Sequence, residues 1–289
     1  MPSFPPPSAL PHLPRRLPPA RAGALTALAG GAVASLALGT AGCVEAPLEP
    51  REPSQGAPHF TVMSYNIELG SVDSATLAAI GSADADIVAL QEVTPEASRV
   101  IQELYAEQYP HQLHRPTGGA GGLAVLSRDS LEDAGVHPGP GGWHPAWHVN
   151  VSMQSGVVQL LNVHLRSPLS AGGGPVASWL ASDADHREEI SDFQSQCDAS
   201  RSNVVLGDFN EGPNGDAVQL LEAEGFFNAL PAFHPGQPTW RYRSVGNQLE
   251  SMLDHVLADE SLVPLNAWTL REGRSDHLPV IAHFEPVSF

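Results

Sequence analysis

The sequence predicts an α/β (α+β) fold in which two packed mixed β-sheets form a sandwich flanked by helices. From residue 60 onward, short apolar runs typical of buried strands alternate with a few amphipathic runs of helical length. Both a short glycine-containing turn and helix-length crossovers join these runs, which indicates antiparallel and parallel strand pairs. No internal repeat is present, and about 230 residues are enough for one such core.

Eight runs are expected to form strands, because each is rich in branched or aromatic residues and is bounded by turn residues. They are 61–67, 86–93, 122–128, 147–153, 157–165, 203–209, 252–258 and 278–286. The "QSG" turn between the fourth and fifth runs predicts a hairpin. In contrast, a helix-length crossover separates the first two runs.

Four helices are expected between these strands. In 96–109 the apolar residues follow the three-four spacing of an amphipathic helix. A second helix is predicted over 214–224, with Asn214 as its cap, and two more over 74–85 and 186–199. The glycine-rich patches lie between strands and lack the strand–loop–helix context of a nucleotide-binding fingerprint.

The first 60 residues differ from the rest of the chain in composition. Residues 1–43 predict an export signal, because three arginines precede the uncharged stretch 22–41 and the segment ends in "TAGC". This ending is similar to a bacterial lipoprotein signal, in which Cys43 would carry lipid; a cleaved secretory peptide or an uncleaved anchor are the alternatives. Residues 44–59 predict a solvated Pro/Glu-rich tether, and 60–289 a single catalytic domain.

The charge balance is strongly acidic, with a formal net charge of −18. All 14 basic residues are arginines, and removal of 1–42 would leave 11 of them against 32 acidic residues. Such a surface repels polyanions at long range, which argues against a protein that coats nucleic acid. It does not exclude phosphate substrates, since a bound cation can neutralise phosphate locally.

The two cysteines predict no internal disulfide if Cys43 is lipidated. Cys197 shares a helical face with Ile190 and Phe193, so a buried structural thiol is expected rather than a nucleophile.

Polar side chains stand at the ends of several apolar strands, where a core would not place them. The stretch "NVVLGDFNEGPN" illustrates the pattern, although turn chemistry alone would also explain its Asp and Asn. The full set is Asn66, Glu92, His164, Asp208, Asn210, Asp254, Asp276 and His277. Burying even one unpaired carboxylate costs several kcal/mol, so a convergence of these groups on a cation would explain them.

The residue types favour a hard metal ion. Mg²⁺, or Mn²⁺ in its place, prefers oxygen ligands and keeps positions for water and substrate phosphate. The histidines are scattered and no Cys/His cluster has zinc spacing. Oxygen ligands with two or more histidines therefore favour metal-assisted cleavage of a phosphate ester.

The ordered motifs "SYNIELG", "LQEV", "NVHL", "GDFN", "LDHVL" and "SDHLPV" resemble the endonuclease/exonuclease/phosphatase superfamily. Its members include deoxyribonucleases, abasic-site endonucleases, sphingomyelinases and inositol-polyphosphate phosphatases. The resemblance spans about residues 60–289 and implies a four-layer α/β sandwich with Mg²⁺-dependent phosphoester hydrolysis.

The resemblance also implies a role for each motif residue. Metal ligation is implied for Glu92, Asn66, Asp276 and Glu68, the last at a position that only some members use. Catalytic roles are implied for Asp208, which orients water, Asn210, which holds phosphate, His277, which contacts phosphate, Asp254, which fixes the tautomer of His277, and His164, a second histidine. Abasic-site enzymes have a tyrosine at the position of His164, so the resemblance argues against that branch of the superfamily.

Several other residues have two interpretations. Arg166, Arg241 and Arg243 could attract phosphate or simply lie on the surface, and His255 is expected to be structural or exposed.

Three functions stay open for a monomeric chain whose partner is a phosphate-ester substrate. They are an exported nuclease or general phosphodiesterase, a sphingomyelinase-like or inositol-phosphatase-like hydrolase, and a non-catalytic binding module on the same fold. The nuclease interpretation is preferred, and membrane contact is expected only through Cys43.

Overall fold

The computed structural model describes residues 46–70, 72–167, 175–244 and 247–287, with the backbone alone for 175–184, 243, 244 and 247. The chain divides into two units, Met1–Val44 and Glu45–Phe289, and the fold described here belongs to the second. The export signal predicted for 1–43 lies outside the described residues. Within the described part of the chain, no helix has the length and apolar character needed to span a bilayer.

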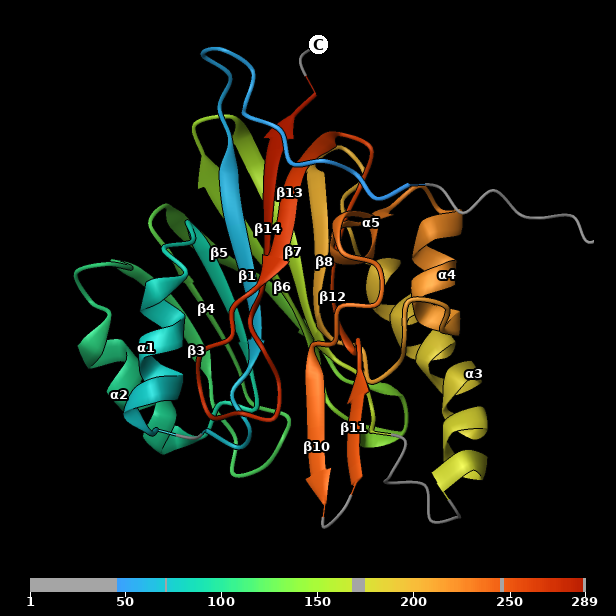
Figure 1. Cartoon of the computed structure of the whole chain (residues 1–289). Coiled ribbons are helices and arrows are strands. Elements are labelled where there is room, and N and C mark those ends of the chain that lie inside the picture. The colour runs from blue at the N-terminus through green and yellow to red at the C-terminus, as the bar shows by residue number, and fades with distance from the viewer. Residues whose placement is uncertain (1–45, 71, 168–174, 245–246, 288–289) are drawn as a thin grey trace, which may run out of the picture. The chain divides into compact units, whose positions relative to one another are not determined.

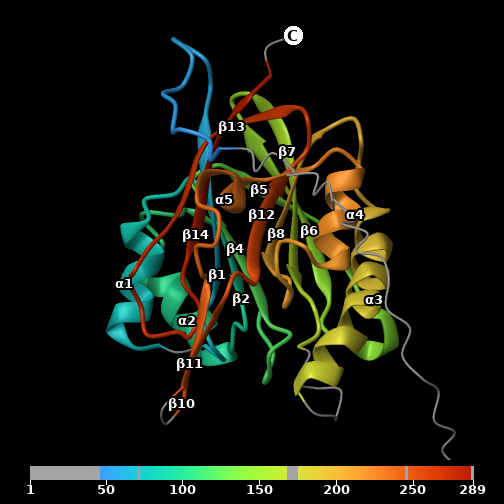
Figure 2. The same ribbon diagram turned by 45° about the vertical axis from the view of Figure 1, so that its right-hand side comes forward.

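Two six-stranded mixed sheets pack face to face, and helices cover their outer faces (Figures 1 and 2). The first sheet has the order β13-β14-β1-β2-β4-β3 and the second β5-β6-β7-β8-β12-β9. The strands of the first sheet are β1 Phe60–Asn66, β2 Ile87–Gln91, β3 His111–Arg115, β4 Leu123–Ser127, β13 Leu262–Thr269 and β14 Val280–Pro286. Those of the second are β5 Ser130–His137, β6 Ala146–Met153, β7 Gly156–His164, β8 Ser202–Asp208, β9 Phe227–Asn228 and β12 Asp254–Ala258.

The remaining elements of the described residues are a hairpin, five helices and a 3₁₀ turn. The hairpin β10–β11 projects from one end of the sandwich and forms a separate two-stranded sheet (Figure 1). These elements are β10 Trp240–Ser244, β11 Asn247–Ser251, α1 Ser74–Ser82, α2 Pro95–Leu104, α3 Pro175–Gln194, α4 Asp216–Ala223, α5 Ala229–Phe233 and η1 Pro140–Gly142.

Three apolar clusters fill the three interfaces between four layers. The central cluster joins the facing sides of the two sheets and includes Val62 of β1, Leu160 of β7 and Val204 of β8. A second lies between the first sheet and α1 and α2, and a third between the second sheet and α3 and α4. Burial of these apolar faces is the main contribution to the stability of the fold. The two mixed sheets with flanking helices confirm the predicted fold class.

All eight predicted strands are present, and their pairing follows the predicted connections. β1 and β2 are parallel neighbours, whereas β6 and β7 form the antiparallel hairpin expected around "QSG". Six further strands were not predicted. Four of them, β3, β5, β9 and β13, are the edges of the two sheets, and β10 and β11 form the projecting hairpin. Partly exposed strands carry polar residues and therefore lack an uninterrupted apolar run.

Helix boundaries differ from the prediction in three places. α3 begins at Pro175 rather than near residue 186, and α2 ends at Leu104, five residues early. The N-cap of α4 is Gly215 and not Asn214. The Glu211 side chain caps this helix from further upstream, since its Oε1 accepts a hydrogen bond from Val218 N at 2.8 Å.

The described part of the predicted tether, residues 46–59, is hydrogen-bonded to the folded unit. Leu48 N donates to Ala232 O at 2.8 Å, and Arg51 N donates to Leu265 O at 2.9 Å. Ser54 N then donates to Glu285 Oε2 at 2.7 Å. These bonds hold residues 46–59 along α5, β13 and β14, so this stretch belongs to the folded unit.

Candidate functional site

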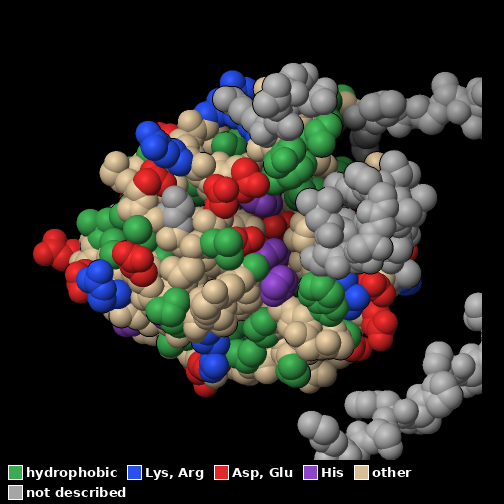
Figure 3. Space-filling model, turned by 90° about the horizontal axis from the view of Figure 1, so that it is seen from below, with side chains coloured by type: hydrophobic (Ala, Val, Ile, Leu, Met, Phe, Trp, Pro, Cys, Tyr) green, Lys and Arg blue, Asp and Glu red, His purple; other side chains and the backbone are tan. Residues whose placement is uncertain are grey.

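The candidate site lies at one edge of the sandwich, where strands from both sheets end together. In the second sheet, His164, Asp208 and Asp254 are direct neighbours across β7, β8 and β12. In the first sheet, Asn66 ends β1 and Glu92 follows β2, which runs parallel to it. Seen from this end, histidine and acidic side chains gather at the centre of the surface (Figure 3).

Asn66 connects the two sheets through its carboxamide. Its Nδ2 donates to Glu92 Oε1 at 3.1 Å and to Asp208 Oδ2 at 3.0 Å. Its Oδ1 accepts from Glu68 N at 3.0 Å, which fixes the orientation of the amide. Asn66 therefore holds the two carboxylates in place, and its predicted role as a metal ligand stays a prediction.

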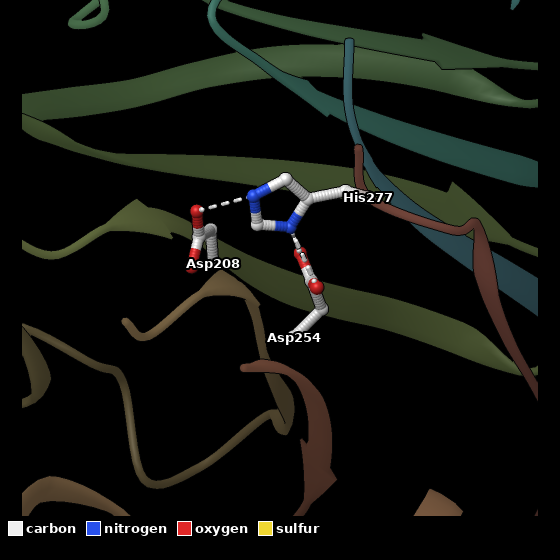
Figure 4. A group of neighbouring side chains, drawn as sticks. All are labelled: Asp208, Asp254 and His277. Carbon is white, nitrogen blue, oxygen red and sulfur yellow. Dashed lines mark hydrogen bonds and ion pairs between the residues drawn. The ribbon is translucent and has the colours of Figure 1, made fainter. Parts of the chain in front are cut away.

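His277 lies between two buried carboxylates (Figure 4). Its Nδ1 is 2.8 Å from Asp254 Oδ2, and its Nε2 is 3.5 Å from Asp208 Oδ2. Thr239 completes the arrangement. Its hydroxyl accepts from the backbone N–H groups of residues 253 and 254, so its own proton is free to donate to Asp254 Oδ2 at 2.6 Å. Asp254 thus accepts two hydrogen bonds and orients the His277 ring.

The charges around His277 favour its protonated form. Burial lowers the pKa of His277, but the nearby Asp254 and Asp208 outweigh burial and raise it to about 10. Burial raises the pKa of Asp208, yet His277 and His164 bring it below its usual range. Burial also raises the pKa of Asp254, opposed by His277; because Asp254 accepts from two donors, we assign the shared proton to His277.

His164 approaches the same carboxylate from the other side. Its Nδ1 is 3.0 Å from Ala120 O, and since a carbonyl only accepts, Nδ1 carries a hydrogen. Its Nε2 is then directed at Asp208 Oδ2, 3.5 Å away, and at Glu92 Oε1, 3.9 Å away. The two imidazoles therefore present their Nε2 atoms on either side of Asp208.

Asn210 is held beside Asp208 by the turn that follows β8. Its backbone N donates to Asp208 Oδ1 at 2.9 Å, and its Nδ2 donates to Leu165 O at 2.9 Å. The turn is locked to the end of β7, so Asp208 and Asn210 keep a fixed spacing from His164.

Three further carboxylates form an acidic cluster beside Asn66. Glu68 Oε2 accepts from Asp276 N at 3.1 Å, and Glu92 Oε2 accepts from Leu69 N at 2.7 Å. Trp240 Nε1 donates to Asp276 Oδ2 at 2.9 Å. Burial, together with the charges of Asp276 and Glu92, raises the pKa of Glu68, which shows that these carboxylates repel one another.

Two groups of side chains at the site offer donor atoms that could bind a metal ion. Ligand atoms of Asp208, Asp254 and His277 lie within 4.8 Å of one another. However, both His277 nitrogens already face carboxylates and its pKa is raised, so a metal there would have to displace protons. The oxygen donors of Glu68, Glu92 and Asp276 match the ligand preference of a hard divalent cation, and neutralising their repulsion would favour binding. The donor types of both groups fit a divalent ion, and among the described residues the ligand atoms of Asp208, Asp254 and His277 lie close enough together to share one. Metal ligation by Glu68, Glu92 and Asp276 stays a prediction.

The backbone is unusual where it presents these side chains. Four non-glycine residues at the site have a positive φ: Glu68 at 50°, Leu69 at 54°, Glu92 at 60° and Asn210 at 52°. Among the described residues only Asp84, which lies elsewhere, shares this property. Positive φ is unfavourable for residues with a Cβ and concentrates at functional sites, where surrounding contacts maintain it.

The arginines and His255 are placed by other interactions. Arg166 bonds Asp185 at 2.8 Å and Glu189 at 3.0 Å, so its guanidinium is already neutralised. Arg241 lies 3.4 Å from Glu250, and the side chain of Arg243 is outside the described residues. His255 is fully buried, with Asn228 Nδ2 and Glu211 O at 3.0 Å, consistent with a structural role rather than an exposed one.

Sequence reasoning missed two kinds of residue at the site. Thr239 and the Ala120 carbonyl bond the catalytic candidates, but a lone threonine and a backbone oxygen leave no mark in a sequence. The pair His186 and Glu211 was also missed. Both side chains are buried, 3.1 Å apart, and His186 Nε2 is 2.8 Å from Arg166 O, which ties α3 to the turn after β8. The signal available in the sequence was Glu211, the acidic residue that directly follows "GDFN".

Solved structures with the same fold support this assignment of architecture. An endonuclease/exonuclease/phosphatase from Beutenbergia cavernae DSM 12333 aligns with a TM-score of 0.62 at 20% identity, covering 79% of this chain and 72% of that chain. TDP2 of D. rerio, solved with a single-strand DNA product, aligns at 0.58 and 14% identity, with coverages of 78% and 98%. SmcL aligns at 0.54 and 17% identity, with coverages of 78% and 99%. No curated protein matches the chain.

The sequence itself matches a family model over most of its length. The match covers residues 63–277, which contain every candidate site residue from Asn66 to His277. Members of this family are typically hydrolases that act on phosphoester bonds. The chain belongs to the Endonuclease/Exonuclease/phosphatase family.

Proposed function

We propose that the protein is an exported Mg²⁺-dependent phosphodiesterase, acting as a nuclease or on a broader range of phosphate diesters. The observation that carries this proposal is the position of Asp208 Oδ2. It accepts from Asn66 Nδ2 at 3.0 Å and has an imidazole Nε2 at 3.5 Å on each side. A carboxylate held ionised between two imidazoles, beside an acidic cluster, places a base, the protonated His277 and a second imidazole at one point.

In this proposal, Glu92, Glu68 and Asp276 would hold the divalent ion, with Asn66 keeping Glu92 in place. When bound, the ion would neutralise phosphate charge and polarise the phosphoryl oxygen. Asp208 accepts a hydrogen bond from the attacking water and takes its proton as the water oxygen bonds to phosphorus. The P–O bond to the leaving group breaks, and the leaving oxygen departs as an oxyanion that solvent protonates. The Nε2–H of His277 donates to a phosphoryl oxygen as its charge increases, His164 Nε2 faces the same point, and Asn210 helps hold the phosphate.

Asp254 contributes indirectly. Its bond to His277 Nδ1 fixes the ring so that Nε2 faces the reacting phosphate, and its charge keeps that nitrogen protonated. Thr239 supports the same orientation through its hydrogen bond to Asp254.

Hydrolysis of bis-p-nitrophenyl phosphate with Mg²⁺, and its loss with EDTA, is the first test. Glu92→Ala should lose most of the metal-dependent rate, whereas Glu103→Ala on the exposed face of α2 is a matched control that should keep it. No turnover by the wild type, together with no effect of Glu92→Ala, would support a non-catalytic binding module instead.

The substrate is then identified by parallel assays on plasmid DNA, RNA, sphingomyelin and inositol phosphates. A nuclease or general phosphodiesterase is preferred, and the DNA product bound by D. rerio TDP2 shows that this fold accommodates a nucleic-acid strand in that protein. Cleavage of the lipid or of inositol phosphate without cleavage of DNA or RNA would overturn this preference and support the alternative hydrolase.

Export and lipid attachment at Cys43 are part of the proposal and rest on the sequence of residues 1–43. Cys43→Ser should move the protein from the membrane to the soluble fraction of the producing cells. Unchanged fractionation of this variant would exclude a lipid anchor at Cys43 without affecting the proposed chemistry.

A further inference from the structure

The connection between β5 and β6 brings a histidine to the site that none of the motifs contains. This connection carries the η1 turn, followed by Trp143 and His144. The ring of His144 is stacked on that of His164, with centroids 4.5 Å apart and planes inclined by 18°. His144 thus covers one flat side of an imidazole that lies 3.5 Å from Asp208.

The loop is built to keep His144 in this place. Gly141 and Gly142 have φ values of 68° and 82°, and a Cβ on Gly139 would collide with His144 O. Trp143 is fixed from outside, because the Arg166 guanidinium lies over its ring at 5.2 Å. Arg166 is in turn bonded to two carboxylates on α3. The stack is therefore supported by glycine geometry on one side and by an ion-pair network on the other.

The edges of the His164 ring are also constrained. Nδ1 is bonded to Ala120 O, and rotation about the Cβ–Cγ bond, which would carry Nε2 away from its position, would break this hydrogen bond. A ring stacked flat against His144 opposes this rotation, because turning would separate the two faces. His144 itself is neutral at neutral pH, since burial, followed by the charge of His164, lowers its pKa to about 4. A neutral ring can stack on His164 without charge repulsion.

We propose that His144 is a positioning residue for this reaction, which sets the angle at which His164 Nε2 meets the phosphate. The inference rests on the proposed hydrolysis of a phosphate diester, in which His164 Nε2 faces the reacting phosphate. His144 makes no contact with the reacting atoms in this account and acts only through His164.

The test compares two substitutions with opposite effects on the stack. His144→Ala removes it, and kcat for bis-p-nitrophenyl phosphate should fall about 10- to 100-fold with KM changed less than about twofold, as expected for a displaced catalytic group. His144→Phe keeps a flat neutral ring and should restore kcat to within about threefold of the wild type. His111→Ala, an exposed histidine on β3, is the matched control and should be unchanged.

A second readout does not depend on activity. The ring ¹H and ¹⁵N resonances of His164, assigned with His164→Gln, should shift in His144→Ala and return toward wild-type positions in His144→Phe, because the stacked ring changes the local field. Thermal unfolding of each variant separates this effect from loss of fold.

The outcomes distinguish the inference from the proposed function. A wild type without metal-dependent turnover would contradict the proposed function, and the resonances would still decide whether His144 orders His164. An active wild type with equal kcat in His144→Ala would overturn the positioning role, as would equal loss in the Ala and Phe variants.

Discussion

Asp208 has more nitrogen atoms around its carboxylate than a residue that only shapes a turn would need. Asn66, His164 and His277 all direct a nitrogen at Oδ2, while Oδ1 accepts from Asn210 N. These contacts keep the carboxylate ionised, so that it can accept a hydrogen bond from the attacking water. The asparagine and aspartate of the "GDFN" turn are therefore explained by the site rather than by local turn chemistry alone.

Asp208→Asn removes the charge while keeping the shape of the side chain. We expect kcat to fall by at least about 10³-fold, because the group that accepts the proton of water is lost. The fold should persist, since Asn66, Asn210 and β8 keep their other contacts. Steady-state kinetics with thermal unfolding of the same sample provide the measurement, and a rate within about tenfold of the wild type would contradict the assigned role.

Asp254→Asn tests the charge that holds His277 protonated. In the wild type the folded-state pKa of about 10 exceeds the ordinary 6.5, so protonated His277 contributes stability fully below pH 6.5. That contribution is lost as pH rises from 6.5 through about 10. The variant should show a His277 pKa well below 10 by NMR titration. Its free energy of unfolding should also decline less between about pH 7 and pH 10 than that of the wild type. An unchanged His277 pKa would show that Asp254 does not set it.

The individual site residues were predictable where a polar group interrupts an apolar run. All nine candidates, including His164 and Glu68, lie together at or near the strand ends at one edge of the sandwich. The residues that orient them were not predictable. Thr239 stands in an ordinary loop, Ala120 acts through its carbonyl, and His144 is one of 13 histidines with no distinguishing pattern.

At the level of elements, the strands that were predicted are the central ones. β1, β2, β7 and β8 are covered on both faces over most of their length and consist mainly of apolar residues, a signal that a sequence reveals directly. β5 and β13 are partly exposed edges, and each pairs through a register shift. Their polar residues and irregular pairing obscure the alternation on which prediction depends.

Close contact between β7 and β8 is required for the site, because it sets the distance from His164 to Asp208. Gly207 has a φ of 146°, and a Cβ there would collide with Val163 O. Gly207→Ala should therefore force the strands apart, lower the free energy of unfolding by about 3 kcal/mol or more, and reduce kcat. Gly118→Ala is the control, since a Cβ there meets nothing within 4 Å and φ is not positive.

Urea unfolding and kinetics on both glycine variants provide the measurement. A Gly207→Ala protein as stable as the Gly118→Ala protein would show that β8 can adjust without cost. In that case the spacing of His164 and Asp208 would have to be fixed by the turn contacts of Asn210 instead.

At the scale of the whole molecule, neither sheet holds the site alone. The first sheet and its loops supply Asn66, Glu92 and His277, and the second supplies His164, Asp208 and Asp254. The central apolar cluster between the sheets therefore determines whether these groups meet. A pattern of strands predicts that two sheets pack, but the registry of one sheet on the other follows from side-chain packing that no single run encodes.

The buried histidines make the whole fold sensitive to acid. Burial lowers the pKa of His148 and His255 to about 4, and both side chains are essentially inaccessible. Below about pH 6.5 the unfolded chain binds protons at these positions while the folded protein does not, so stability is present above pH 6.5 and falls toward pH 4. Each histidine lowers the free energy of unfolding by at most about 1.4 kcal/mol per pH unit in this window. His277 adds nothing to this decline, because it is protonated in both the folded and the unfolded state.

Urea unfolding from about pH 7 to pH 4.5 should show this decline in the free energy of unfolding, and His148→Gln should make it shallower. A stability that stays constant over this range would mean that the imidazoles reach solvent protons without unfolding.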